Sequence, residues 1–268
     1  MAAPAPELAP DLAQGLRRLK LARMRAMAPE LLVVAKTQRW SPEEFLRTLV
    51  EAEIASREAS NARARLKAAN FPVTKTLDDF DVSASSIPKA TLDYLASLEW
   101  VRAKESPVLI GPAGTGKSHV LVAVGHAAVD AGYRVRYFSA VELVETLYRG
   151  LADNSVGRVI DSILRADAVL VDELGFAPLD HTGAQLLFRF VAAAYERRAL
   201  GVASHWPFEE WGRFLPEHTT AVSLLDRLLH HSIVVVTRGE SFRMRESKTR
   251  RAGKTPIELK EVVAAPAS

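Results

Sequence analysis

The residues with the clearest chemistry form a glycine-rich run near the middle of the chain. The run is Gly111-Pro112-Ala113-Gly114-Thr115-Gly116-Lys117-Ser118, which fits the phosphate-binding loop pattern G-x-x-x-x-G-K-[ST]. Glycines allow backbone angles that turn N–H groups inward around phosphate oxygens, and the following helix adds its positive end. Lys117 is expected to reach the β- and γ-phosphates and Ser118 to bind Mg²⁺. The pattern predicts a nucleoside triphosphate site that continues to His119, and the expected nucleotide is ATP.

The segments on either side of this loop have the patterns that such a site needs. Residues 106–110 are a short, mostly apolar run that ends at the loop, and residues 118–128 have the composition of a buried helix that leaves it. This context favours a nucleotide site over a glycine turn without a ligand.

A second strand with acids at its end follows the loop at some distance. The segment Ala168-Val169-Leu170-Val171-Asp172-Glu173 runs from apolar residues into two adjacent carboxylates. Asp172 is expected to hold Mg²⁺, through its water shell or through Ser118, and Glu173 to orient and polarise an attacking water. The alternative is a surface turn that opens before Gly175. A Glu beside the Asp points to hydrolysis of the nucleotide rather than to its storage.

Strand and helix patterns alternate through the second part of the chain. Strands are expected at 108–110, 133–138, 169–172, 200–204 and 233–237, and helices at 140–150, 156–165, 181–198 and 221–230. This alternation predicts an α/β fold with a parallel sheet covered by helices on both faces. Ligands of such sheets bind beyond the carboxyl ends of the strands, where the loop, Asp172 and the pair Ser204-His205 are expected to converge.

The first part of the chain is predicted to be a small helical domain. Apolar residues recur at helical spacing from Leu12 to Leu31, and Ser41 with Glu44 forms a capping box for a helix that runs toward Lys67. Residues 16–67 contain twelve Lys/Arg and six Asp/Glu. These basic helices either contact nucleic-acid phosphates or present a solvated face.

The change from helical periodicity to strand-helix alternation predicts two domains, followed by a tail. Pro72 ends the helical region, so residues 1–70 form a helical domain for DNA binding or oligomerisation. Residues 71–250 form the ATPase domain, with a linker at 71–81, and residues 251–268 form a basic, then disordered tail. Residues 1–10 are Ala- and Pro-rich and are also expected to be disordered.

Composition indicates a soluble enzyme, and a cytoplasmic location is expected. The 268 residues are 48% hydrophobic and 25% charged, with no cysteine and a formal net charge of +3. No apolar run approaches the ~20 residues that span a bilayer. The N-terminus lacks the basic residues followed by an apolar run that form a secretory signal. The absence of cysteine excludes disulfides and thiolate metal sites. A membrane partner is therefore not expected.

The sequence resembles a known family along nearly its whole length. Besides the two motifs above, the matching segments are Phe71-Pro72, 75–81, Leu174-Gly175, Pro178-Leu179-Asp180, Gly183-Ala184, Leu187-Phe188, Tyr195-Glu196-Arg197, Pro207-Phe208, Trp211-Gly212, 225–232 and 238–243. With these segments in order, the chain is similar to the IstB-like ATP-binding proteins, helper ATPases encoded beside the transposase in bacterial insertion sequences. The related DnaC-like loaders of replicative helicases belong to the same wider group.

This resemblance implies a P-loop NTPase of the AAA+ type that forms a homo-oligomer with ATP at subunit interfaces. It also implies binding to duplex DNA and assistance to the transposase encoded by the same element. Arg227 is then similar to the arginine finger that completes a neighbouring subunit's site, the alternative being an Asp-Arg surface pair on a helix. Arg243 is a weaker candidate for contact with the nucleotide or a neighbouring subunit.

One segment departs from the family pattern. After the fourth strand this family usually has Thr-Ser-Asn, whose Asn senses the γ-phosphate, whereas this chain has Ala203-Ser204-His205. His205 can donate a hydrogen bond much as an amide does, with a pH dependence near neutrality. Two alternatives stay open: Ser204 serves as the sensor, or hydrolysis is weakened and the protein acts as an ATP-binding clamp.

Two further features have weaker implications. His230-His231 suggests a metal site, but the sequence shows no acid or third histidine at ligand spacing, so a helix surface or interface is expected. Residues 238–260 hold eight Lys/Arg and three Asp/Glu, and either contact DNA or the transposase or only solubilise the tail. A helicase loader remains the alternative function, and the acid pair with no lid signature argues against a small-molecule kinase.

Overall fold

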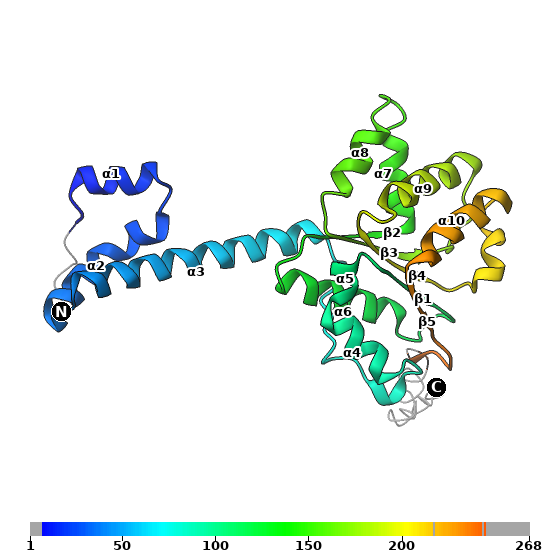
Figure 1. Ribbon diagram of the computed structural model, residues 1–268, viewed down its shortest axis with the longest axis horizontal. Helices are drawn as coiled ribbons and strands as arrows, with labels where there is room; N and C mark the ends of the chain where they lie inside the picture. The colour runs from blue at the N-terminus through cyan, green and yellow to red at the C-terminus, as the bar shows by residue number, and fades with distance from the viewer. Residues whose placement is uncertain (1–6, 217, 243, 245–268) are drawn as a thin grey trace, which may run out of the picture. The chain divides into compact units, whose positions relative to one another are not determined.

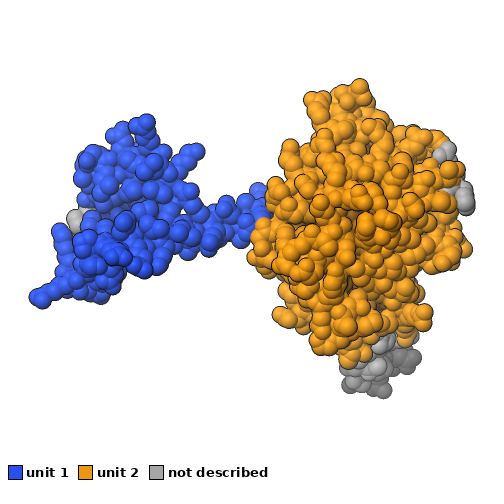
Figure 2. Space-filling view, in the orientation of Figure 1, with its two compact units in different colours: residues 1–67 blue, residues 68–268 orange. Residues whose placement is uncertain are grey.

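The computed structural model describes residues 7–216, 218–242 and 244. The chain divides into two compact units, residues 1–67 and 68–268, which Figure 2 shows in different colours. Each unit is described by itself below. Arg243, the basic stretch beyond Met244 and the predicted tail at 251–268 lie outside the described residues, as do residues 1–6 of the Ala- and Pro-rich start.

The described part of the first unit consists of three helices, which Figure 1 labels. They are α1 (Pro10–Arg18), α2 (Ala22–Gln38) and α3 (Pro42–Ala69), so the predicted pattern from Leu12 to Leu31 is split between two helices. Lys20, with φ of 57°, forms part of the turn between them. The Ser41 hydroxyl accepts a hydrogen bond from the Glu44 amide, as half of the predicted capping box. The last helix ends just before Phe71-Pro72, where proline prevents its continuation.

A buried carboxylate ties the helices of this unit together. Glu53 on α3 accepts hydrogen bonds from the amides of Arg23 and Met24 at the start of α2, and from Arg57 one turn further along. The hydrogen bond from Arg57 and these two amides hold the pKa of Glu53 below its ordinary value. An ionised Glu53 therefore fixes the start of α2 against α3.

The second unit contains the predicted parallel sheet. Its described strands are β1 (Ser106–Ile110), β2 (Val135–Ser139), β3 (Ala168–Leu174), β4 (Ala199–Ser204) and β5 (Ser232–Val236). All pairings are parallel, in the order β2-β3-β4-β1-β5, so β4 and β5 flank the strand that leads into the glycine-rich loop. The strands lie at the predicted places because each is a short apolar run between turn residues.

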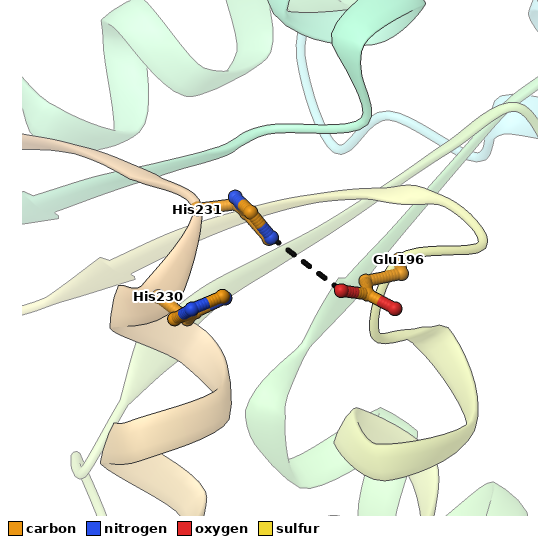
Figure 3. Close-up of side chains that lie close together, drawn as sticks. All are labelled: Glu196, His230 and His231. Atoms are coloured by element: carbon orange, nitrogen blue, oxygen red, sulfur yellow. Dashed lines mark ion pairs between the residues drawn. The ribbon is translucent and has the colours of Figure 1, made fainter.

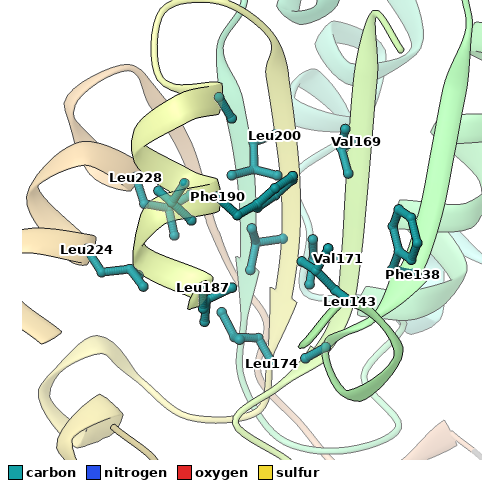
Figure 4. Close-up of a cluster of buried hydrophobic side chains, with 14 of the residues drawn as sticks. Phe138, Leu143, Val169, Val171, Leu174, Leu187, Phe190, Leu200, Leu224 and Leu228 are labelled. Atoms are coloured by element: carbon teal, nitrogen blue, oxygen red, sulfur yellow. The ribbon is translucent and has the colours of Figure 1, made fainter. Parts of the chain in front are cut away.

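Helices cover both faces of this sheet (Figure 1). One face packs against α4 (Lys89–Ser97), α5 (Glu99–Ala103) and α6 (Lys117–Asp130). The other packs against α7 (Ala140–Arg149), α8 (Val156–Ile163), α9 (His181–Ala194) and α10 (His218–His230). Figure 4 shows this second core, which includes Phe190 of α9, Leu224 of α10, and Val171 and Leu200 of the sheet. Short 3₁₀ helices span Val82–Ala84 and Phe208–Arg213.

The prediction for the end of α9 was wrong. The sequence predicts a helix to residue 198, but α9 ends at Ala194, and Glu196 has a left-handed φ of 56°. The amides of Arg197 and Arg198 both donate to the Ala194 carbonyl oxygen, which closes the helix with a turn. This turn directs the chain into β4. The sequence analysis also missed α4 and α5.

Among the described residues, no helix combines the length and apolar composition needed to cross a membrane.

Candidate nucleotide site

The glycine-rich loop lies between the carboxyl end of β1 and the start of α6. Gly111, Gly114 and Gly116 have φ values of 138°, 78° and 97°, which residues with a side chain rarely adopt. A Cβ at Gly111 would lie 2.2 Å from the carbonyl oxygen of Thr237, so the position also has no room for a side chain. The loop therefore has the open backbone and helix N-terminus that bind phosphate.

The lysine of the motif lies against its own loop. The Lys117 ammonium donates to the carbonyl oxygens of Gly111 and Pro112, each at 2.7 Å, and only 8% of the residue is exposed. Lysine is a flexible point charge, so its head can exchange these carbonyls for phosphate oxygens without a change in the fold. The positive charge thus stands at the mouth of the loop.

The glycine-rich loop and the acidic end of β3 meet through a hydrogen bond. The Ser118 hydroxyl donates to Oδ1 of Asp172 at 3.1 Å, and the Tyr137 hydroxyl donates to Oδ2 at 2.9 Å. Asp172 is 4% exposed. Burial and the charge of Asp172 raise the pKa of Tyr137, so Tyr137 stays a protonated donor. Sequence reasoning missed Tyr137, although it stands on the strand next to β3.

The second acid, Glu173, is exposed and points away from the buried side of the strand. The β3–β4 register shifts between Val171 and Leu174, and Glu173 has a left-handed φ of 58°. Such a bulge turns a side chain out of the alternation of the strand, and bulges are frequent beside active sites. The bulge leaves Asp172 buried beside Ser118 and presents Glu173 to solvent at the same edge of the sheet.

Ser204 and His205 lie at this edge as predicted, but in different environments. The Ser204 hydroxyl donates to the Leu174 carbonyl at 2.8 Å and accepts from the Trp206 amide at 3.2 Å, so it holds two loops together. His205 is partly exposed and lies against Trp206. Burial, and then the positive charge of Lys117, lower the pKa of His205. The effect of Lys117 on this pKa indicates that His205 lies within the electrostatic influence of the lysine.

The chain after β5 returns to the loop, which the sequence analysis did not anticipate. The hydroxyls of Thr115 and Thr237 share a hydrogen bond at 2.6 Å, and the Phe242 amide donates to the Gly114 carbonyl at 3.0 Å. Ser241 lies over Gly114, where a Cβ would be 2.1 Å from its hydroxyl. The segment from Thr237 to Phe242 therefore forms one wall of the loop.

The linker before the sheet forms another wall. Phe80 lies over Gly116 and contacts the edge of the His119 ring, whose Nε2 donates to the Thr76 carbonyl at 2.9 Å. His119 was predicted to contact the nucleotide, and the structure places it on the linker side of α6. It lies two residues from the lysine of the motif, so it can support the site by fixing the linker.

Arg227 does not approach the loop of its own chain. It lies on α10, donates to the Ser223 carbonyl at 3.1 Å and stacks over the Phe188 ring, with its guanidinium carbon 4.9 Å from the ring centre. It lines a small pocket with Ser106, the first residue of β1, and His231, which directly precedes β5. Arg227 thus lies toward the amino-terminal edge of the sheet, opposite the edge that carries the loop.

The fold brings an acid to the histidine pair, contrary to the sequence expectation. Glu196, from the turn after α9, lies beside His230 and His231 at the end of α10 (Figure 3). The pair and the acid are separated by a strand and a helix in the chain, so spacing along the sequence could not reveal them. This cluster is distinct from the nucleotide site.

The residues at the loop fit ATP with Mg²⁺. Ser118 and Asp172 offer oxygen atoms, which Mg²⁺ prefers, at the start of the helix where phosphates bind. Bound Mg²⁺ would neutralise charge on the β- and γ-phosphates. With the nucleotide bound, Glu173 would accept a proton from water and Lys117 would orient the phosphates.

Comparison with known proteins identifies similar chains. The family model described as "IstB-like ATP binding protein" matches residues 14–250. A Pseudomonas aeruginosa protein named as the ATP-binding protein of insertion sequence IS21 is 34% identical over 254 residues, which are 92% of this chain and 95% of the relative. The corresponding protein of IS5376 from Geobacillus stearothermophilus is 33% identical, over 86% of this chain and 92% of its own length.

A solved structure supports the fold. The structure of DnaI superposes with a TM-score of 0.53 at 15% identity, over 61% of this chain and 91% of DnaI. At this identity the likeness shows a shared fold, the parallel P-loop sheet of the AAA+ type, and nothing about partners.

Proposed function

Since the chain belongs to the family of IstB-like ATP-binding proteins of insertion sequences, we propose that it hydrolyses ATP, assembles on duplex DNA and assists the transposase encoded by the same element. The observation that carries this proposal is the contact of Ser118 with Asp172, which completes a Mg²⁺–ATP site beside an exposed Glu173. The proposal places the protein in the bacterial cytoplasm, where ATP and the DNA of the element meet.

Hydrolysis is supported by the different environments of two adjacent acids. Asp172 is buried and hydrogen-bonded, so it stays in place as a metal ligand, whereas Glu173 is exposed at the edge where the γ-phosphate would lie. In this proposal Glu173 polarises the attacking water, and His205, neutral at pH 7, donates to the γ-phosphate. The Ser204 hydroxyl already forms hydrogen bonds with two backbone groups, the Leu174 carbonyl and the Trp206 amide. This favours His205 over Ser204 as the sensor.

DNA binding is supported by the charge of the first unit. Exposed basic side chains gather on α1 and the start of α2, and a second group lies near the end of α3: Arg17, Arg18, Lys20 and Arg23, then Arg63 and Lys67. Cations on helices neutralise phosphates and release counterions, which makes DNA affinity fall with salt. The proposal assigns these helices to the duplex backbone.

Assembly is supported by the position of Arg227. A residue that lies away from the loop of its own chain can complete a site only in a neighbouring subunit, as a finger supplied in trans. Its contacts with Phe188 and the Ser223 carbonyl hold the side chain on the surface of α10. The proposed oligomer therefore has heterologous interfaces, with ATP between subunits.

The first test is analytical sedimentation of the full chain with a non-hydrolysable ATP analogue. A large complex that forms with both nucleotide and duplex, and does not form with Lys117→Ala, supports the proposal. Adding the transposase of the element should then raise the hydrolysis rate and DNA strand transfer. A complex that forms equally without nucleotide would contradict the proposed role of ATP.

The same experiment separates the alternative function. A helicase loader would prefer single-stranded to duplex DNA and would bind a hexameric helicase. If the large complex forms on single strands and not on duplex, the transposition proposal is wrong and the loader is favoured.

A further inference from the structure

We propose that Glu196, His230 and His231 form a binding site for a divalent transition-metal ion, separate from the nucleotide site. One ligand atom from each side chain lies within 4.8 Å of the others, and all three residues are exposed. Two imidazoles and one carboxylate are a frequent ligand set for Zn²⁺, and three protein ligands leave an open position for water.

The strand order explains why these residues meet. Glu196 precedes β4 and His231 precedes β5, and β1 lies between these two strands. Because the strands are parallel, their amino ends share one edge of the sheet. The Ser106 amide, at the start of β1, donates to the His231 carbonyl oxygen at 2.8 Å and fixes that backbone. The cluster therefore stands on rigid elements at the edge opposite the nucleotide.

The distances suit a single ion. His231 Nε2 lies 3.6 Å from a carboxylate oxygen of Glu196, and Figure 3 shows the His231 ring directed at this carboxylate. Ligand atoms about 2.0–2.2 Å from a tetrahedral ion are roughly 3.3–3.6 Å from one another. His231 Nε2 and the Glu196 oxygen are thus already near the required separation. Rotation of the exposed side chains brings the third ligand, His230, into range.

Tyr195 orients one of the histidines. Its hydroxyl shares a hydrogen bond with Nδ1 of His230 at 2.8 Å, and its ring lies against both His230 and His231. When Nδ1 carries the proton and donates to Tyr195, Nε2 of His230 is left as the ligand atom. Metal-bound histidines commonly donate their other ring N–H in this way, which fixes the tautomer.

The surrounding charge decides which ions fit. Lys104, Arg198 and Arg227 line a small pocket together with Glu196 and His231. The two guanidinium groups donate to backbone carbonyls, Arg198 to Leu164 and Arg227 to Ser223. Their charge nevertheless weakens a site that relies on ionic attraction alone. It therefore disfavours Mg²⁺ and Ca²⁺, and favours an ion such as Zn²⁺ that imidazole nitrogen binds strongly.

The test uses the full chain without a polyhistidine tag, treated with a chelator and free of nucleotide. Calorimetric titration with ZnCl₂ should show one ion per chain at this site. His230→Ala, His231→Ala and Glu196→Gln should each weaken Zn²⁺ binding at least tenfold. Tyr195→Phe should weaken it by about tenfold, and by less than the three ligand variants, because it removes an orienting partner and not a ligand.

Matched controls separate this site from adventitious binding. His181→Ala, an exposed histidine that shares a hydrogen bond with Gln185, should leave Zn²⁺ affinity unchanged. Zn²⁺ should raise the melting temperature of the wild type and not of His231→Ala, while the two melt alike without metal. Millimolar Mg²⁺ should not displace the Zn²⁺.

Two results would overturn the proposal. In the first, the wild type does not bind Zn²⁺ up to millimolar concentration, and Glu196 and His231 then form an ion pair only. In the second, the ligand variants bind as well as the wild type, and the ion then sits elsewhere. Neither result bears on ATP hydrolysis, so this inference stands or fails independently of the proposed function.

Discussion

The Ser118 hydroxyl lies 3.1 Å from the Asp172 carboxylate, and this hydrogen bond joins the start of α6 to the end of β3. It puts the two oxygen ligands proposed for Mg²⁺ side by side before any nucleotide binds. Preorganised ligands stabilise the transition state without the cost of bringing them together. The Ser118–Asp172 contact therefore preorganises the proposed Mg²⁺ site.

Replacing Asp172 with Asn should abolish the dependence of ATP binding on Mg²⁺. The change keeps the shape of the side chain and removes its charge, so transition-state stabilisation falls by several kcal/mol and the hydrolysis rate by about 10²-fold or more. Titration of a fluorescent ATP analogue with and without Mg²⁺, beside a steady-state hydrolysis assay, measures both effects. Unchanged Mg²⁺ dependence would show that the ion is held elsewhere.

Tyr137→Phe should separate stability from catalysis. The change removes one hydrogen bond to a buried carboxylate, and the free energy of unfolding should fall by about 1.5–3 kcal/mol. Ser118 and the Glu173 amide still contact Asp172, so ATP should still bind. Urea unfolding followed by circular dichroism measures the loss. A variant as stable as the wild type would mean that water replaces the hydroxyl without cost.

Changes at Glu173 should stop hydrolysis in two different ways. Glu173→Gln should keep ATP bound and slow the chemical step about 10²–10⁴-fold, since the side chain can no longer accept a proton. Glu173→Gly should be equally inactive and also more stable, by roughly 1 kcal/mol, because glycine relieves the left-handed backbone. Single-turnover hydrolysis and thermal unfolding are the measurements. Normal turnover by the Gln variant would remove Glu173 from the mechanism.

Two inactive variants should restore activity when mixed, if Arg227 acts in trans. Lys117→Ala loses its own ATP site, and Arg227→Ala loses the group it gives to a neighbour. Equal mixing should recover about a quarter of the wild-type rate, because that share of heterologous interfaces combines an intact Lys117 with an intact Arg227. Both variants should sediment as oligomers. Absence of recovery from such oligomers would exclude the trans arrangement.

The pH profile should identify the sensor. Burial and then Lys117 lower the pKa of His205 below its ordinary 6.5, so the ring is neutral at pH 7. If the neutral ring is needed, kcat/KM should be constant above pH 6.5 and fall as the pH drops through the lowered pKa. This moves the pH dependence from near neutrality, where the sequence placed it, to the acid side.

His205→Asn is the matched variant for this profile, because an amide donates a hydrogen bond but does not titrate. It should keep most of the activity and lose the acid limb, whereas His205→Ala should be slow at every pH. The free energy of unfolding should change with pH in the same direction. Because His205 has a lower pKa in the folded than in the unfolded chain, the unfolded state binds more protons, and the wild type loses stability relative to His205→Asn as the pH falls below 6.5. Identical profiles for wild type and both variants would exclude His205.

The sequence by itself determined the local parts of this protein. The glycine pattern defines the loop, the apolar run ending in two acids defines β3, and strand-helix alternation defines the parallel sheet. These features depend on neighbouring residues, on backbone freedom and on hydrophobic periodicity, which a sequence displays directly. The family resemblance rests on the same local motifs, and the match over residues 14–250 confirms it.

Only the tertiary structure decided which distant residues meet. Tyr137 reaches Asp172 because β2 pairs with β3, and Thr237 reaches the loop because β5 pairs with β1. The same strand order places Arg227 away from its own loop and Glu196 beside the histidine pair. Strand order is set by how helices and strands bury their apolar faces together, and separation along the chain does not encode it.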